Sequence, residues 1–424
     1  MNGLARKLNA ALGPAAEFLS LEGKRMYFPY GGILGQSAEA KACDINATIG
    51  MAFEEDGSPL VMDCFLDNVA VGKKAFLYAG SFGNPALRKK WKEMEVSKNP
   101  SLKGRRFSDP VVTNALTHGL RIAAELFADA RDELVVPDLF WDNYELIFRE
   151  AVGCRVRHFR TFKSGGFDAA AMKKALLSPG KKKILILNFP NNPTGYTATF
   201  EDARRIVAAV KAAAQAGKRI VVVLDDAYFG LVYEKGVHGE SLFAEFSDLH
   251  ENVLAVKLDG TTKEDYVWGL RVGFISFAFK GAGDEQLKAL EAKAAGNVRS
   301  SISNSSSIGQ SLAVAAYGNA AYARQKREKF AVLRRRYTEI RRILARHPEY
   351  AETFEPMPFN SGYFMCVKPV GVDAEAVRRR LIEGYSTGTI VLSGLIRLAY
   401  STTPLKKLPT LFANVDAAIR DLRK

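Results

Sequence analysis

The chain has 424 residues, and its formal net charge is +14 because 60 lysines and arginines outnumber 46 aspartates and glutamates. Hydrophobic residues at 47% and charged residues at 25% are typical of a folded globular protein and exclude a disordered chain. The length suggests two or three domains, while the positive charge is compatible with nucleic acid, a membrane surface or small anions as partners.

The cysteines and histidines argue against disulfides and metal. Cys43, Cys64, Cys154 and Cys366 are far apart and form no C-x-x-C pair, which favours a reducing, cytoplasmic setting. The five histidines show no metal-ligand spacing, so we expect no metal. No stretch approaches the ~20 apolar residues of a membrane span, and we expect no membrane partner.

Residues 110–280 alternate short apolar runs with longer helical segments, which predicts a mostly parallel sheet with crossover helices. Thr199, with Asp202 three residues later, is expected to cap a helix that ends before Gly217. The expected strands are Val111–Thr113, Glu133–Val136, Arg155–Phe159, Ile184–Phe189, Ile220–Leu224, Val253–Leu258 and Phe274–Phe277.

One long helix is predicted from about Asn319 to His347, and strands at Gly362–Lys368 and Ile396–Tyr400 indicate a smaller C-terminal domain. The arginines of the long helix lack a nucleic-acid reader motif, so we expect them, Lys181–Lys183 and the C-terminal tail to form solvated surface. The expected organisation is an N-terminal arm with part of the small domain, a large domain, and the interdomain helix with the rest of the small domain, at residues 1–60, 61–320 and 321–424.

Chemically capable residues follow four predicted strands. Trp141 follows the strand at 133–136, and Asn192 lies in an N-N-P-T-G loop. Asp225 ends a buried strand, and Lys263 follows the next strand, with Arg271 eight residues later. Each alone is compatible with a turn or an ordinary core or surface residue, but ligands of open α/β sheets bind at the carboxyl ends of strands. Phosphate-loop, dinucleotide and serine-nucleophile motifs are absent.

In this order, the four segments resemble the fold-type I pyridoxal 5'-phosphate (PLP) enzymes and, among them, the class I aminotransferases of the aspartate and aromatic branch. The resemblance implies an α/β fold in which a mostly parallel seven-stranded sheet is sandwiched by helices in a large PLP-binding domain, with a smaller α+β domain from the N- and C-terminal segments. Further matching motifs are Asn46–Met51, Glu55–Pro59, Tyr78 with Gly83, Asn297–Arg299 with Ser303–Asn304, and Ile396–Tyr400.

The resemblance implies catalytic roles for three residues. Lys263 would hold the cofactor aldehyde and then act as general base and acid. Asp225 would face the pyridine nitrogen and keep it protonated. Tyr228 and Asn192 would hydrogen-bond the phenolic oxygen, and Trp141 would stack on the ring.

The resemblance also implies an anion-binding set. Arg271 would bind the phosphate, Arg397 would clamp the substrate α-carboxylate, and Gly50, Asn192 and Trp141 would also line the substrate site. Tyr78 and Arg299 would act on the neighbouring subunit, at the phosphate and at a distal substrate group, so a homodimer with shared active sites is expected. The remaining phosphate contacts would come from Ala115, Leu116, Thr117 and Thr262.

This chain departs from the family pattern at three places, the first of which is Ala115-Leu116, where the family often has a Ser-Gly or a Gly at the phosphate turn. Gly260 stands where a serine commonly contacts the phosphate, and Tyr144 stands where the aspartate branch often has a histidine. We expect the Tyr144 phenol to hydrogen-bond Asp225 in place of that histidine.

The resulting expectation is an enzyme that moves an amino group from an L-amino acid, aspartate or an aromatic one, to a 2-oxo acid such as 2-oxoglutarate in a ping-pong cycle, with no nucleic-acid partner. Two alternatives stay open. The same cofactor scaffold supports lyases and decarboxylases of amino acids, and a transcription regulator with an aminotransferase-like domain would use the basic charge.

Overall fold

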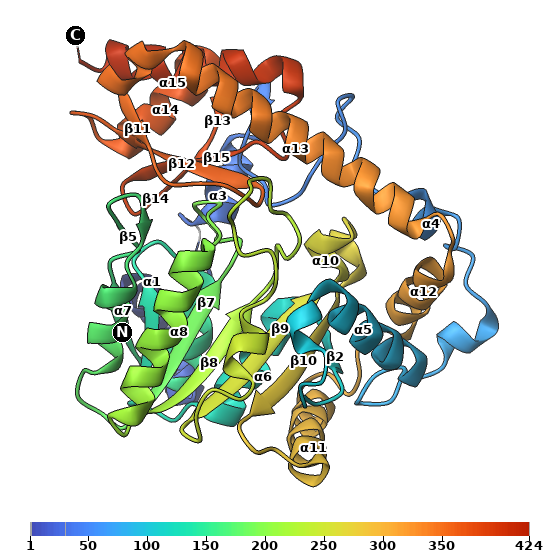
Figure 1. The fold of residues 1–424 in the computed structure, drawn as a ribbon. Helices are drawn as coiled ribbons and strands as arrows, with labels where there is room; N and C mark the ends of the chain where they lie inside the picture. The colour runs from blue at the N-terminus through green and yellow to red at the C-terminus, as the bar shows by residue number, and fades with distance from the viewer. Residues whose placement is uncertain (1, 30, 424) are drawn as a thin grey trace.

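The computed structural model describes residues 2–29 and 31–423. Its centre is a seven-stranded sheet of order β2-β10-β9-β8-β7-β3-β4, in which only β10 runs antiparallel to its neighbours (Figure 1). The predicted seven-stranded, mostly parallel sheet is thus confirmed. The strands are β2 Val111–Asn114, β3 Glu133–Pro137, β4 Arg155–Phe159, β7 Lys182–Asn188, β8 Arg219–Asp225, β9 Val253–Gly260 and β10 Val272–Phe279.

The central strands are apolar on both faces because helices cover both. In β8, Val221 and Val223 belong to one core with α6 (Ala115–Phe127), whereas Val222 and Leu224 belong to a second core with α7 (Ala169–Leu176) and α8 (Phe200–Gln215). The start of α8 carries the predicted capping box, with Thr199 accepting from the Asp202 N–H at 3.1 Å.

A smaller α+β part lies above the large sheet and combines both ends of the chain (Figure 1). Its antiparallel sheet has the order β11-β12-β15-β14, and β1 pairs in parallel with β13, which joins the N-terminal segment to the C-terminal one. The elements are β1 Ile45–Asn46, β11 Phe354–Pro356, β12 Phe364–Pro369, α14 Ala374–Tyr385, β13 Thr387–Gly388, β14 Ile390–Leu392, β15 Leu395–Ala399 and α15 Leu408–Asp421. The predicted small domain is confirmed as an α+β unit.

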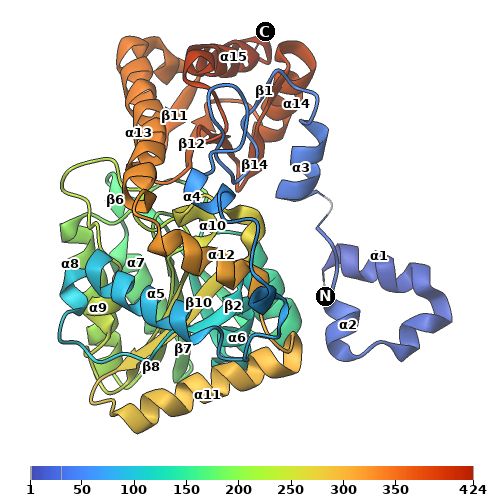
Figure 2. The same cartoon turned by 90° about the vertical axis from the view of Figure 1, so that its right-hand side faces the viewer.

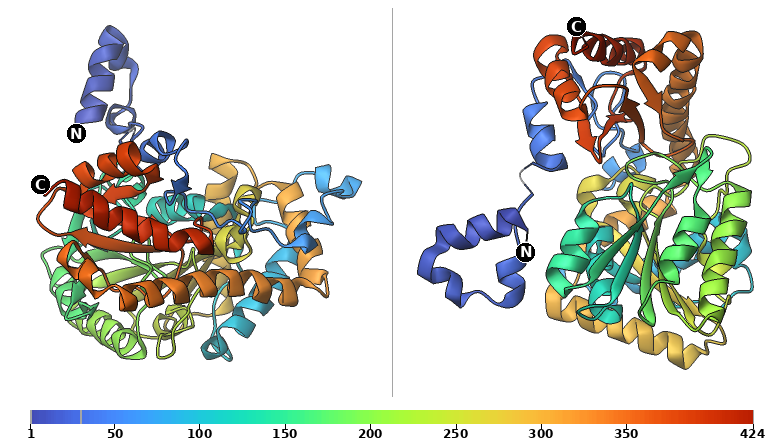
Figure 3. Two further views of the ribbon diagram at one scale, coloured as in Figure 1. Left: turned by 90° about the horizontal axis from the view of Figure 1, so that it is seen from above. Right: turned by 90° about the vertical axis from the view of Figure 1, so that its left-hand side faces the viewer.

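The predicted long helix is α13, Tyr322–Arg346, which runs from the large part to the small one (Figure 2). At the other end of the chain, α1 and α2 extend away from the body (Figures 2 and 3). The remaining helices are α1 Gly3–Leu12, α2 Leu21–Arg25, α3 Ile33–Glu39, α4 Asp63–Leu66, α5 Pro85–Lys98, α9 Phe243–Phe246, α10 Thr261–Glu264, α11 Asp284–Ser301, α12 Ser307–Gly318 and a π-helix at Glu145–Val152. Short strands β5 Phe162–Lys163 and β6 Gly166–Phe167 pair with each other, and short 3₁₀ helices occupy Gly13–Phe18, Lys73–Phe76, Pro100–Leu102, Trp268–Leu270, Pro348–Glu352 and Leu405–Lys407.

The prediction of solvated surface is wrong for two basic residues. Lys183 is fully buried beside Glu133, its register partner on the neighbouring strand. Arg336 is fully buried on the inner face of α13, where it donates to Glu55 at 2.7 Å. A buried cation needs a carboxylate partner, and both partners are distant in the sequence. Within residues 2–29 and 31–423, no helix has the length and apolar character that a membrane crossing requires.

Candidate active site

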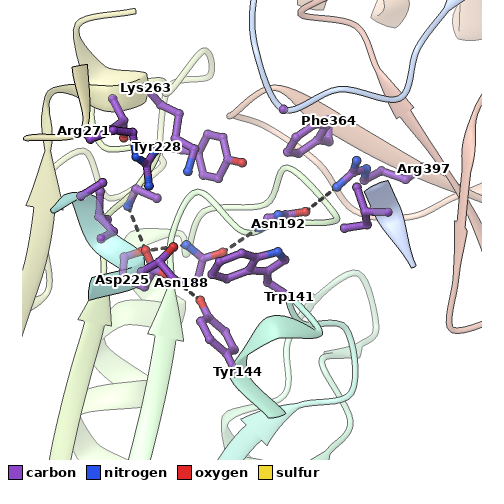
Figure 4. Close-up of a pocket in the computed structure, with 17 residues that line it drawn as sticks. Trp141, Tyr144, Asn188, Asn192, Asp225, Tyr228, Lys263, Arg271, Phe364 and Arg397 are labelled. Carbon is purple, nitrogen blue, oxygen red and sulfur yellow. Dashed lines mark hydrogen bonds between the residues drawn. The ribbon is translucent and has the colours of Figure 1, made fainter. Parts of the chain in front are cut away.

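A pocket of about 250 Å³ lies at the carboxyl ends of β7, β8 and β9, beneath the small sheet (Figure 4). It contains every site residue that the sequence predicts except Tyr78 and Arg299. Its lining is Ile33, Gly50, Ala115, Leu116, Thr117, Trp141, Tyr144, Asn188, Asn192, Asp225, Ala227, Tyr228, Thr262, Lys263, Arg271, Phe364 and Arg397.

Asp225 ends β8 and is buried in the floor of the pocket. Its Oδ2 accepts a hydrogen bond from the Tyr144 phenol at 2.6 Å, which confirms the expected contact, and its Oδ1 accepts from the Ala227 N–H at 3.2 Å. Burial raises the pKa of Asp225, whereas the Tyr144 hydrogen bond and the Lys263 charge lower it. The carboxylate is therefore held in a fixed orientation in a poorly solvated position.

Lys263 lies on α10, just after β9, and its side chain projects into the pocket. Its Nζ lies 4.9 Å from the centre of the Tyr228 ring and donates to no side chain or carbonyl in the part of the chain that the structure describes. Burial lowers the pKa of Lys263, Arg271 lowers it further, and Asp225 opposes both. A lowered amine pKa favours the neutral, nucleophilic form.

The N-N-P-T-G loop is tied to the sheet by a residue that the sequence analysis did not select. Asn188 accepts from the Asn192 N–H at 2.7 Å and donates to the Asp225 carbonyl at 2.7 Å. Asn192 Oδ1 in turn accepts from Arg397 Nη1 at 2.9 Å. The position of Asn188, at the end of β7, is the signal that could have identified it.

Arg397 lies on β15 and is only 1% exposed. Its Nη2 donates to the Thr48 carbonyl at 2.7 Å, its guanidinium lies 4.2 Å from the Phe364 ring centre, and its Nε has no hydrogen-bond partner among the described residues. No acidic side chain of residues 2–29 and 31–423 forms an ion pair with it. Because an uncompensated buried charge is unfavourable, this guanidinium is suited to a ligand carboxylate.

The opposite end of the pocket has the features of a phosphate site. The α6 helix begins at Ala115, and the first N–H groups of a helix lack partners within it. Two non-glycine residues here, Ala115 (φ 60°) and Arg271 (φ 56°), have left-handed backbones, and such strain collects at functional sites. A Cβ on Gly273 would lie 2.7 Å from the Ala115 carbonyl carbon, so only glycine allows this close approach.

This donor set fits PLP. The pocket offers an amine for an aldehyde, a buried carboxylate for a pyridine nitrogen, and a guanidinium with helix N–H groups for a phosphate. Thr262 Oγ1 is buried and has no partner among the described residues, so a ligand could satisfy it. The described part of the chain contains no group of His, Cys, Asp or Glu side chains suited to a metal ion.

Tyr78 and Arg299 lie outside the pocket of their own chain. Tyr78 is 93% exposed, and Arg299 is exposed with its Nη1 donating to Ser303 Oγ at 2.8 Å. Ser81 Oγ donates to the Ser303 carbonyl at 2.9 Å, which places the two turns side by side. Ile33 and Phe364 line the pocket but carry no motif, so the sequence analysis did not select them.

Comparison with known proteins identifies relatives of this chain. It is 26% identical to an aspartate aminotransferase of Geobacillus stearothermophilus over 57% of this chain and 56% of the relative. A probable N-acetyl-LL-diaminopimelate aminotransferase of Bacillus subtilis is 25% identical over 50% of this chain and 48% of the relative. The match therefore spans about half the length of these relatives.

Solved structures share the fold over nearly the whole chain. An aminotransferase from Anaerococcus prevotii superposes with a TM-score of 0.81 at 21% identity, covering 93% of this chain and 98% of the other. The aspartate aminotransferase of Thermus thermophilus with maleate gives 0.74 at 19% identity, covering 95% and 98%. The sequence model described as aminotransferase class I and II matches residues 56–412. The chain belongs to the aminotransferase class I and II family.

Proposed function

We propose that the chain is a PLP-dependent aminotransferase that moves an amino group from an L-amino acid to a 2-oxo acid in a ping-pong cycle. One observation carries the proposal: a single pocket combines the Lys263 amine, the buried Asp225 and the guanidinium of Arg397, and among the described residues neither cation forms an ion pair with a carboxylate. Amine, carboxylate and guanidinium are the groups that an aldehyde cofactor and an amino-acid carboxylate require.

Each residue has a defined task in this reaction. When bound, PLP supplies the aldehyde that takes up the amino group and the ring that accepts electrons. Lys263, once free, removes and returns the proton at the substrate Cα. Asp225, held by Tyr144, keeps a proton at the ring nitrogen. Arg397 and Asn192 orient the substrate carboxylate.

We propose aspartate as the preferred amino donor, aromatic amino acids as the second choice, and 2-oxoglutarate as an acceptor. The support is the name of the G. stearothermophilus relative together with Arg299, whose guanidinium would bind a distal carboxylate. A panel of amino donors with 2-oxoglutarate tests the order. Unchanged aspartate activity in Arg299→Leu would show that Arg299 has no such role.

The expected homodimer is part of the proposal. Phe76, Leu77 and Tyr78 are 71%, 67% and 93% exposed on one turn, beside the turn of Arg299. A second copy of the chain would cover this apolar surface and bring both turns to its own active site. Mixing Lys263→Ala chains with Tyr78→Ala chains should give more activity than either parent, because the hybrid dimer has one complete site. A mixture no more active than the average of the parents contradicts shared sites.

We also propose a cytoplasmic location, with the four free cysteines as support, since a reducing compartment keeps thiols unpaired. This location predicts that the cysteines are reactive in protein isolated under thiol-trapping conditions, and cysteines found paired in disulfides would contradict it.

Spectroscopy tests the cofactor directly. Purified protein given PLP should gain visible absorbance that Lys263→Ala protein does not show in the same form, and a wild-type protein that stays colourless refutes the proposal. Ammonia or carbon dioxide released without any 2-oxo acid would instead identify a lyase or a decarboxylase.

A further inference from the structure

A second cavity, of about 530 Å³, lies between α5, α10 and the N-terminal half of α13. Figure 1 shows α10 between these two helices. The cavity shares no lining residue with the active-site pocket. Its volume is in the range of small-molecule sites, and its walls are mainly apolar and aromatic: Met94, Phe229, Leu231, Tyr266, Tyr322 and Phe330.

Two of the three basic residues of this cavity form ion pairs, and among the described residues the third does not. Lys98 and Lys326 both contact the buried Glu264, at 2.9 Å and 2.8 Å, and Lys326 also contacts Asp265 at 3.0 Å. Arg327 is exposed at the rim and forms no hydrogen bond or ion pair with residues 2–29 or 31–423. The three basic residues are offset by the carboxylates of Glu264 and Asp265, which leaves a positive charge at Arg327 and favours an anion.

We propose that this cavity binds a small aromatic carboxylate. The aromatic ring would pack among Phe229, Tyr322 and Phe330, and the carboxylate would pair with Arg327, whose planar guanidinium matches a carboxylate geometrically. A neutral ligand would leave the positive rim without a partner, and an inorganic anion would leave the apolar walls without contacts. The inference does not depend on the proposed function.

The cavity adjoins the back of the active site. Its lining residues Phe229 and Glu264 directly follow Tyr228 and Lys263, which line the active-site pocket. The two sites therefore lie on opposite sides of the same two chain segments.

Phenylacetate is a suitable probe because it has neither an amino nor an oxo group and cannot be a transamination substrate. Its binding to the PLP-loaded protein is measured by equilibrium dialysis. Arg327→Glu should weaken binding about tenfold or more, since a charge-assisted hydrogen bond becomes a repulsion. Arg335→Glu, an exposed position on the same helix but outside the cavity, should change binding by less than about twofold.

The active site could also bind phenylacetate through Arg397, and Arg397→Leu separates the two sites. Retained binding in Arg397→Leu supports the second cavity. No saturable binding to the wild type, or binding that Arg397→Leu abolishes and Arg327→Glu leaves intact, overturns the proposal.

Hydrogen exchange provides a measurement on the unmodified protein. Phenylacetate should slow exchange in residues 94–98 and 322–330, which face the cavity. Slowing confined to the segments around the active-site pocket would overturn the assignment.

Discussion

Two lysines six residues apart, Lys257 on β9 and Lys263 on α10, lie in contrasting surroundings. Lys257 is 1% exposed on the far side of the sheet from the pocket, in contact with Asp259 and 3.1 Å from both Glu95 and Asp226. Lys263 projects into the pocket, and no carboxylate of residues 2–29 or 31–423 forms an ion pair with it. Burial lowers the pKa of both amines, but the three carboxylates raise the pKa of Lys257 well above its usual value.

The comparison shows that the carboxylates around a buried lysine determine its pKa, and with it whether the amine has a structural or a chemical role. Lys257 stays charged and serves as the centre of a buried ionic cluster formed with Glu95, Asp226 and Asp259. Lys263 has no such ion-pair partner in the described part of the chain, and its lowered pKa makes the amine available for covalent and proton-transfer chemistry. Asp225 and Asp226 are successive residues at the end of β8, and their side chains point to opposite faces of the sheet because side chains alternate along a strand. The charge of Asp225 therefore acts on Lys263, whereas Asp226 contacts Lys257.

Removing Lys263 should have the largest effect. Lys263→Ala is expected to lower the amino-transfer rate ~10⁴-fold or more while leaving the thermal unfolding temperature nearly unchanged, since among the described residues the amine forms no ion pair or hydrogen bond and contacts only the Tyr228 ring, 4.9 Å from its centre. Steady-state kinetics and thermal melts check both parts. A Lys263→Ala protein that keeps its activity would contradict the chemical role of Lys263.

Removing Lys257 should affect folding. Lys257→Met leaves carboxylates buried without their cation and is expected to lower the free energy of unfolding by about 3–5 kcal/mol. Urea unfolding measures this change in the free energy of unfolding. Lys174→Met, at an exposed position, is the matched control and should stay within about 0.5 kcal/mol of wild type. Equal stability of the two variants would contradict a structural role for Lys257.

Tyr144→Phe should have a smaller effect on catalysis. The variant loses the 2.6 Å hydrogen bond that lowers the pKa of Asp225, so this pKa rises further. Activity should fall about tenfold, and the acidic limb of the pH profile of kcat/KM should move to higher pH. Tyr337→Phe, which removes a buried phenol paired with Glu234 outside the pocket, should leave that limb in place. An unmoved limb in Tyr144→Phe would show that the phenol does not tune Asp225.

Glu95→Gln tests the ionic cluster through the pH dependence of the free energy of unfolding. Burial and the Asp259 charge hold the pKa of Glu95 well above its usual value. Between the usual and the raised pKa, the folded protein therefore binds more protons than the unfolded chain, and stability falls as pH rises. Glu95→Gln should remove this slope, which amounts to at most ~1.4 kcal/mol per pH unit for one proton. Urea unfolding from acidic to neutral pH measures this slope, and parallel slopes in both proteins would contradict a raised pKa of Glu95 in the ionic cluster.

Much of the fold and the site could be predicted from the sequence, because they depend on local patterns. Apolar runs and turns located the seven strands, and the carboxyl ends of parallel strands share one edge, which brings Asn192, Asp225 and Lys263 together. The Thr199 cap likewise depends only on residues close in the chain.

Only the tertiary structure decided which charges are paired. Lys183 and Arg336 belong to runs of basic residues that look solvated, yet each is buried against an acid far away in the sequence. Arg397 is the opposite case: it lies on the small sheet and enters the pocket, and no described acidic residue forms an ion pair with it. Asn188, Ile33 and Phe364 join the site for the same reason. Local periodicity determines the elements through backbone geometry and hydrophobic burial, whereas the burial and pairing of a lysine or arginine depend on neighbours that only the folded chain assembles.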